Sequence, residues 1–316
     1  MREQSVPGLH HVTAVASDPQ HNAEFYTQVL GFRLVKRTVN FDDPTTYHLY
    51  YGNETGAPGA LLTFFPFGTG YRGQIGRGQP VATAFTIPDG AVQYWIDRLD
   101  AHDVNRGQTE ERFGRTVIPF KDSDGQPLEL VTGPAAAEPW CEGPVAPEHA
   151  LRGIHGVTLL SADLEATERI LAVLGYEQRG RESDRIRYST PGDPRTVVDL
   201  LDRPGAAPGR PGAGTVHHVA FRTANEDTQA AWRERLSDMD LPLRVTRVKN
   251  RQYFKSIYFR EPGGILLEIA TDGPGFERDE ARDSLGTALK LPPSLETERD
   301  RLEAVLPDLS VGTHPD

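Results

Sequence analysis

Short apolar runs recur along the chain, and each is followed by a stretch in which apolar positions have helical spacing. Four segments open alike, and each opening predicts a short strand: GLHHVT at 8–13, PVATAF at 80–85, GIHGVT at 153–158 and TVHHVAF at 215–221. Because internal repeats define the architecture of a chain, these openings predict four copies of one structural unit.

An amphipathic helix is predicted after the opening strands. Residues 92–99 carry apolar side chains at i, i+3, i+4 and i+7, which favours one buried helix face, and Thr228, Trp232, Leu236 and Met239 form a similar stripe. The first helix is expected to begin at Asp18, because aspartate caps helices well and a proline follows it. The first and third helices are expected to end at Gly31 and Gly175, since glycine is the usual residue just past a helix.

Strand-like runs close the units at 59–65, 125–131, 196–201 and 263–269. A unit of one strand, one helix and several further strands predicts an α+β fold of four modules. We expect an N-terminal domain of two modules over 1–135, a linker at 136–150, a C-terminal domain of two modules over 151–275 and a C-terminal extension at 276–316. The extension, with a charged helix near 294–305, is expected to pack over the core.

Composition narrows the class of protein. The 316 residues carry 34 Lys and Arg against 45 Asp and Glu, a net charge of −11 without a basic stripe, so nucleic acid and anionic membranes are not expected partners. The chain has neither an apolar run of membrane-spanning length nor a signal-peptide pattern at its N-terminus. These features predict a soluble, cytoplasmic protein. Cys141 is the single cysteine, so a metal site must use His and carboxylate side chains.

Aligning the four units places chemically distinctive residues at two equivalent positions. The opening position holds His11, Ala82, Gly156 and His218, and the closing position holds Phe64, Glu129, Asp199 and Glu268. Pairing the first unit with the fourth brings together His11, His218 and Glu268, with Phe64 in a fourth position that cannot bind a metal. Two imidazoles and one carboxylate suit Fe(II) that activates oxygen, and Mn(II) is also compatible. The alternative to a metal site is that these residues have structural roles. A single histidine on a strand is more often a hydrogen-bonded polar residue than a metal ligand.

The sequence also resembles a known family. Its marks are GLHHVT (8–13), FYTQVLGFRLVKRTVNFDDPTTYHLYYGNETGAPG (25–59), EHALRGIHG (148–156), HHVAF (217–221), KNRQYFKSIYFREPGGILLEIA (249–270) and SLGTALKLPP (284–293). Over nearly the whole chain, to about residue 305, it is similar to the vicinal oxygen chelate superfamily, and within it to the four-module dioxygenases that cleave hydroquinone and catechol rings. The resemblance implies βαβββ modules paired as two half-barrels, with Fe(II) held by His11, His218 and Glu268.

The resemblance further implies a set of residues around the metal, namely His10, Thr13, His217, Arg251 and Tyr258. His10 and His217 should point away from the ligands unless their strands bulge, and a structural role explains them equally well. Tyr258 should return near Glu268 across a hairpin and exchange a proton with substrate, or else form an ordinary cross-strand pair. Arg251 would hold a substrate oxygen by charge-assisted hydrogen bonds, or else be a surface cation.

The expected reaction is the opening of a hydroquinone or catechol ring with O2. We expect Phe64, Phe65, Tyr253 and Phe254 to wall the pocket, and His48 either to line it or to be a half-buried strand residue. GTGYRG at 68–73 fits a dinucleotide motif but leads into a strand, so it predicts an inter-module loop. A glyoxalase-like lyase or thiol-transferase and a non-enzymatic quinone- or drug-binding protein are the alternative functions, and a homo-oligomer is left open.

Overall fold

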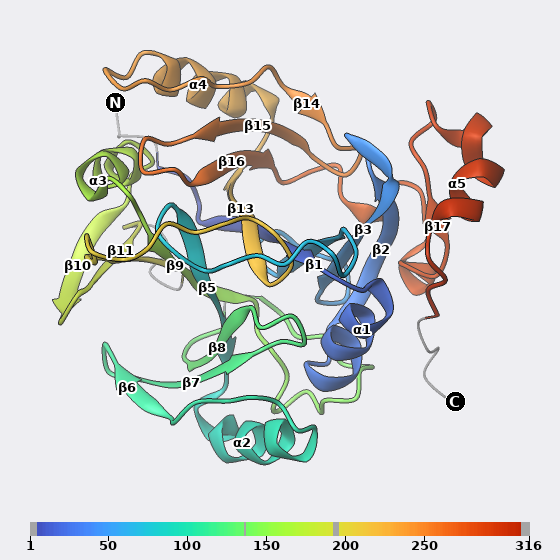
Figure 1. The fold of residues 1–316 in the computed structure, drawn as a ribbon, viewed down its shortest axis with the longest axis horizontal. Helices are drawn as coiled ribbons and strands as arrows, with labels where there is room; N and C mark the ends of the chain where they lie inside the picture. The colour runs from blue at the N-terminus through green and yellow to red at the C-terminus, as the bar shows by residue number, and fades with distance from the viewer. Residues whose placement is uncertain (1–4, 136, 192–195, 311–316) are drawn as a thin grey trace.

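Two strongly curved sheets form the body of the protein, as Figure 1 shows. The computed structural model describes residues 5–135, 137–191 and 196–310. One sheet has the strand order β14-β15-β16-β13-β1-β4-β3-β2-β17, and the other has the order β10-β11-β12-β9-β5-β8-β7-β6. The expectation of an α+β fold of two half-barrels is confirmed.

The strand bounds follow the predicted repeat. The first sheet contains β1 (Leu9–Ala16), β2 (Arg33–Asn40), β3 (Asp43–Gly52), β4 (Leu61–Pro66), β13 (Thr215–Thr223), β14 (Lys249–Asn250), β15 (Lys255–Arg260), β16 (Leu266–Thr271) and β17 (Leu289–Lys290). The second contains β5 (Gln79–Ile87), β6 (Glu110–Arg112), β7 (Arg115–Lys121), β8 (Pro127–Thr132), β9 (Ile154–Leu160), β10 (Glu177–Glu182), β11 (Arg185–Ser189) and β12 (Val197–Leu201).

Each sheet combines modules from opposite halves of the chain. The first and fourth modules join where β1 pairs antiparallel with β13, and the second and third join where β5 pairs with β9. The halves at 1–135 and 151–275 therefore each contribute strands to both sheets. Their boundaries as separate domains remain a prediction, while the pairing of the first module with the fourth is confirmed.

One helix from each module packs on its sheet. The helices are α1 (Pro19–Glu24), continued by a π-helical turn at Phe25–Val29, then α2 (Val92–Ala101), α3 (Leu164–Val173) and α4 (Glu226–Ser237), with α5 (Arg299–Val305) in the extension. Asp18 caps α1, and Gly31 and Gly175 follow their helices with φ of 73° and 85°, as expected. Helix α4 packs on β15 and β16, and its Gln229 amide donates to the Lys255 and Ile269 carbonyls.

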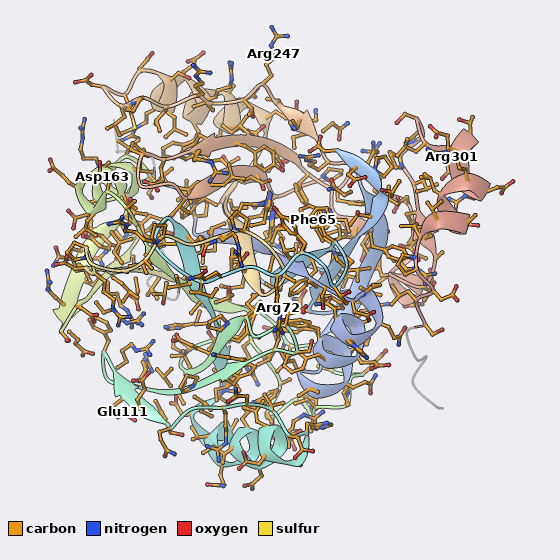
Figure 2. All side chains as sticks on the ribbon, in the orientation of Figure 1. Phe65, Arg72, Glu111, Asp163, Arg247 and Arg301 are labelled. Carbon is orange, nitrogen blue, oxygen red and sulfur yellow. The ribbon has the colours of Figure 1, made fainter. Side chains whose placement is uncertain are left out.

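The C-terminal extension packs against the first sheet, as expected, and also adds a strand to it. Short 3₁₀ turns at Phe276–Arg278, Arg282–Ser284 and Glu296–Glu298 lead past β17, which pairs with β2. The buried Lys36 ammonium of β2 binds the carboxylates of Asp279 and Glu280, so an ion pair anchors the extension. Figure 2 shows Arg301 at the periphery, whereas Phe65 lies near the centre of the molecule.

Candidate metal centre

The strands that carry the paired histidines each contain a β-bulge. The β1–β13 register shifts by one residue between Leu9 and His11, and shifts back between Thr13 and Ala14. The extra residues are His10 on β1 and His217 on β13. Because a bulge interrupts the alternation of side chains, both histidines can approach the ligand beside them in sequence.

Three buried donors converge at the junction of the two modules. The Nε2 atoms of His11 and His218 lie 3.3 Å apart, and Glu268 Oε2 lies 3.3 Å from the first and 2.9 Å from the second. His11 and His218 come from β1 and β13, and Glu268 comes from β16, whose Leu267 and Ile269 face the hydrophobic core instead. The predicted ligand set is thus brought together in space.

The spacing of these donors fits one divalent metal ion. Adjacent ligands about 2.1 Å from a metal and roughly at right angles are about 3.0 Å apart. Neither oxygen of the buried Glu268 has a hydrogen-bond partner of regular geometry among the described residues. Burial alone would raise the pKa of Glu268, but His11 and His218 hold that pKa well below its usual value. The carboxylate is therefore ionised and available as a ligand.

Each candidate histidine ligand contacts the histidine that precedes it in sequence. His10 Nδ1 lies 2.9 Å from His11 Nδ1, and His217 Nδ1 lies 2.7 Å from His218 Nδ1. A metal-binding histidine with free Nε2 carries its proton on Nδ1, and a partner for that proton fixes the ring. The bulges thus place a ring nitrogen beside Nδ1 of each candidate ligand, where it can accept that proton.

The fourth position of the site belongs to Thr63, which corrects the expected Phe64. In parallel register Ala220 pairs with Glu268, and the equivalent Thr13 pairs with Thr63. Phe64 points to the other face, where its ring lies 4.6 Å from that of Tyr26. The Thr63 hydroxyl is 2.8 Å from that of Thr13 and 2.9 Å from His48 Nε2. These contacts make Thr63 part of a hydroxyl and imidazole network, and it offers no carboxylate.

Tyr258 and Arg251 lie beside the three donors. Tyr258 is the cross-strand partner of Glu268, as the hairpin predicted, and its ring packs edge-on against His218. Burial and the nearby Glu268 raise the pKa of Tyr258, so the phenol keeps its proton at neutral pH. Arg251 Nε donates to the Tyr258 hydroxyl at 3.1 Å, and Arg251 Nη2 donates to Asp42 at 2.8 Å.

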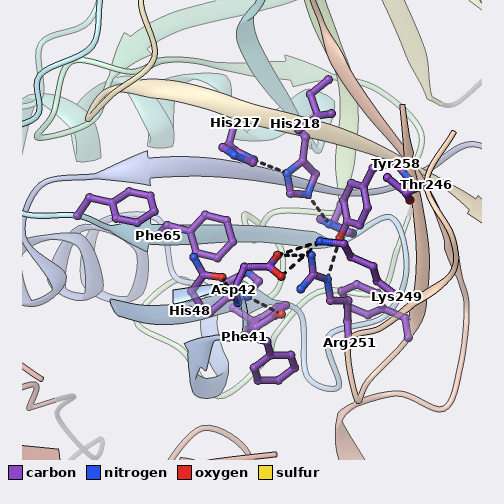
Figure 3. Close-up of a pocket in the computed structure, with 16 residues that line it drawn as sticks. Phe41, Asp42, His48, Phe65, His217, His218, Thr246, Lys249, Arg251 and Tyr258 are labelled. Atoms are coloured by element: carbon purple, nitrogen blue, oxygen red, sulfur yellow. Dashed lines mark hydrogen bonds and ion pairs between the residues drawn. The ribbon is translucent and has the colours of Figure 1, made fainter. Parts of the chain in front are cut away.

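A cavity of about 290 Å³ opens beside His11 and His218 (Figure 3). Its wall includes Phe65 and Phe254, as expected, and also His48, for which this was one of two roles left open, together with His217, Arg251 and Tyr258. Tyr253 instead lines a second cavity of about 390 Å³, where it is joined by His10 and Phe254. Thr13 lies behind the wall, in contact with Thr63.

The equivalent region of the second sheet contains no comparable set of ligands. Glu129 and Asp199 occupy the closing positions but bind Arg112 and Arg187 at 2.9 and 2.8 Å. Ala82 and Gly156 provide no donor at the opening positions. Within the described residues, the group of side chains close enough to hold a metal is His11, His218 and Glu268.

The sequence patterns do not point to Asp42, Thr63 or Lys249 as part of the site. Asp42 and Lys249 line the cavity, where Figure 3 shows their ion pair with Arg251 beside them. The glycine before each closing strand is the sequence signal that could have identified Thr63. Gly125 and Gly264 lie four residues before the closing carboxylates Glu129 and Glu268, and Gly59 lies four residues before Thr63. All three glycines have positive φ, of 89°, 84° and 98°.

Two relatives of this chain are named as dioxygenases. The protein named "Putative ring-cleaving dioxygenase MhqO" from Bacillus subtilis is 44% identical over 94% of both chains. The chlorohydroquinone/hydroquinone 1,2-dioxygenase of Sphingobium indicum is 36% identical over 96% of this chain and 97% of its own. No helix among the described residues is long and apolar enough to cross a membrane.

Solved structures share the fold. A crystal structure described as a "putative dioxygenase" from Bacillus subtilis matches with a TM-score of 0.93 at 44% identity, covering 98% of this chain and 99% of that one. Glyoxalase I from Zea mays matches with a TM-score of 0.60 at 15% identity, over 84% of this chain and 92% of that one, which shows the fold alone. Residues 8–130 and 149–269 match the family profile. The chain belongs to the Glyoxalase/Bleomycin resistance protein/Dioxygenase superfamily.

Proposed function

We propose that this protein is an Fe(II)-dependent, extradiol-type dioxygenase that opens a hydroquinone- or catechol-type ring with O2, with Mn(II) as the alternative metal. The observation that carries the proposal is the convergence of His11, His218 and Glu268 on one point beside a cavity of about 290 Å³. The names of the Bacillus and Sphingobium relatives support a ring-cleaving reaction. The aromatic diol and O2 are then the partners.

Fe(II) bound to these ligands would acidify a phenol hydroxyl and bring the electron-rich ring together with O2. Around it, His10 and His217 keep the ligand rings oriented through their Nδ1 contacts. Phe65 and Phe254 give the cavity apolar walls that suit an aromatic ring and exclude water. Three protein ligands leave coordination positions open, whereas a closed four-ligand site would not.

Tyr258 and Arg251 act on the substrate in this proposal. The Tyr258 hydroxyl keeps its proton and lies at the cavity wall, where it can donate that proton to a substrate oxygen. Arg251 stabilises negative charge on the same oxygen by charge-assisted hydrogen bonds. Thr13, which contacts Thr63, supports the strand that carries His11.

Oxygen-electrode traces on protein loaded anaerobically with Fe(II) or Mn(II) test the proposal. With a small panel of hydroquinones and catechols, we expect uptake of one O2 per ring opened, and loss of uptake in Glu268→Gln. A thiol adduct formed without oxygen uptake would instead favour the glyoxalase-like alternative. Tight binding of quinones without turnover, unchanged in Glu268→Gln, would favour a binding protein.

A further inference from the structure

Asp42 links the two metal-binding modules across the mouth of the cavity. It lies at the tip of the hairpin between β2 and β3 in the first module. Its carboxylate accepts from Arg251 Nη2 at 2.8 Å and lies 3.3 Å from the Lys249 ammonium, both in the fourth module. Among the described residues that line this cavity, Asp42 supplies the one carboxylate.

Both loops that meet at this ion pair are held by an asparagine. The Asn40 side chain accepts from the Asp42 backbone N–H at 3.0 Å, and the Asn250 side chain accepts from the Gln252 backbone N–H at 2.8 Å. Gln252 has a φ of 68°, a conformation that a non-glycine residue adopts only when its surroundings impose it. The carboxylate and the guanidinium are therefore presented from shaped turns.

Arg251 is held on two sides of its guanidinium. Asp42 binds Nη2, while Nε donates to the Tyr258 hydroxyl at 3.1 Å. The Lys249 and Arg251 cations both lie near the Tyr258 ring, at 5.9 and 5.3 Å from its centre. Without a carboxylate between them, the two cations repel each other, and Arg251 loses the partner that fixes its planar group.

We propose that Asp42 is a positioning residue, which holds Arg251 in register with the Tyr258 hydroxyl from across the module junction. The proposal rests on the proposed function, in which Arg251 and Tyr258 act on a substrate oxygen. Asp42 itself need not touch the substrate. Its effect on turnover should therefore pass entirely through Arg251.

Kinetics of five variants test this dependence: three single variants at Asp42 and Asp43, the Arg251→Lys variant, and the double variant that combines Arg251→Lys with Asp42→Asn. We expect Asp42→Asn, which keeps the shape and removes the charge, to lower kcat roughly 10-fold or more, in the range of other supporting partners of a site. Asp42→Glu should restore part of the loss. The neighbouring exposed Asp43, whose carboxylate accepts from Thr45 within its own turn, provides the matched control Asp43→Asn, with unchanged kcat. In an Arg251→Lys background, Asp42→Asn should have no further effect on kcat.

A measurement independent of turnover follows Arg251 directly. In metal-free protein, the Arg251 Nε–H resonance, identified by its loss in Arg251→Lys, should be sharp in wild type and in Asp43→Asn. It should broaden by exchange with water in Asp42→Asn. A retained sharp resonance in Asp42→Asn, or an additive loss of kcat in the double variant, would overturn the proposal. Absence of ring cleavage by wild type, with the resonance still lost in Asp42→Asn, would contradict the proposed function while supporting the contact.

Discussion

His217 Nδ1 lies 2.7 Å from His218 Nδ1, and His10 repeats this contact with His11 at 2.9 Å. Both orienting histidines are the extra residues of bulges where β1 and β13 pair. The second sheet has a corresponding bulge at His155, where β5 pairs with β9. Among the described residues, that sheet carries no cluster of side chains that could hold a metal. Both sheets thus contain the bulge, and among the described residues the set of candidate metal ligands lies beside the bulges of the first sheet.

Removing an orienting histidine should weaken metal binding. His217→Ala leaves the His218 ring without its Nδ1 partner, and partners of this kind typically contribute about 10- to 100-fold in metal affinity. Competition with a chromophoric chelator measures the change. His155→Ala, at the corresponding bulge of the other sheet, is the matched control and should bind metal like wild type. Equal affinities in both variants would show that the Nδ1 contact does not support the site.

Metal binding should stabilise the fold. A ligand at 100 times its Kd adds about 2.7 kcal/mol to the free energy of unfolding. For a chain of this size that corresponds to a rise in Tm of about 4 °C. Calorimetry with and without Mn(II) measures the shift, which should disappear in Glu268→Gln. A similar shift in that variant would place the metal elsewhere.

Thr63 offers a test of the open coordination positions. It stands where symmetry with Glu268 would put a second carboxylate. Thr63→Glu should tighten binding of divalent metal and reduce O2 uptake by at least about 10-fold, because a fourth protein ligand closes a position that the reaction needs. Chelator competition and the oxygen electrode measure the two effects. Phe64→Leu, on the core side of the same strand, should leave both properties unchanged. Full activity together with tighter binding in Thr63→Glu would contradict this account of the open site.

Asp122 should make stability depend on pH. Burial raises the pKa of Asp122 to about 6, although it accepts hydrogen bonds from Tyr26 and from the Gln126 backbone. Because the folded protein then keeps this proton to higher pH than the unfolded chain, the free energy of unfolding falls as pH rises from about 4 to about 6.

Asp122→Asn removes this penalty. Between pH 4.5 and pH 7.5 its stability relative to wild type should improve by about 2 kcal/mol. Urea unfolding at both pH values measures the difference, and the exposed Asp43→Asn serves as control. A difference that does not change with pH would contradict the assignment.

Much of the fold followed from residue patterns. The four openings, the glycines after the first and third helices and the Asp18 cap all depend on local rules, and the structure confirms them. The joining of modules from opposite halves was visible only through the chemistry of His11 and His218. The π-helical turn at Phe25–Val29 and the added strand β17 depend on tertiary packing, which local patterns do not report.

The convergence of His11, His218 and Glu268 was predictable because each lies at an equivalent position of a repeat. The closing position of the first module was assigned to Phe64, one residue after the correct Thr63. The apolar residues around Thr63 give no alternation that would fix the register, and the spacing from Gly59 was the remaining signal. The inward approach of His10 depends on a bulge, which alternation alone does not predict. Asp42 was missed because its partners come from a loop more than 200 residues away in sequence.

Isotope labelling shows whether the protein inserts both atoms of O2 into an aromatic ring. Fe(II)-loaded protein should be turned over with a hydroquinone or catechol under ¹⁸O2, and the product mass measured. We expect a ring-opened acid that contains both atoms of one O2 molecule, formed by wild type and not by Glu268→Gln. A quinone without ¹⁸O, or a ring-opened product that takes its oxygen from water, would contradict this expectation.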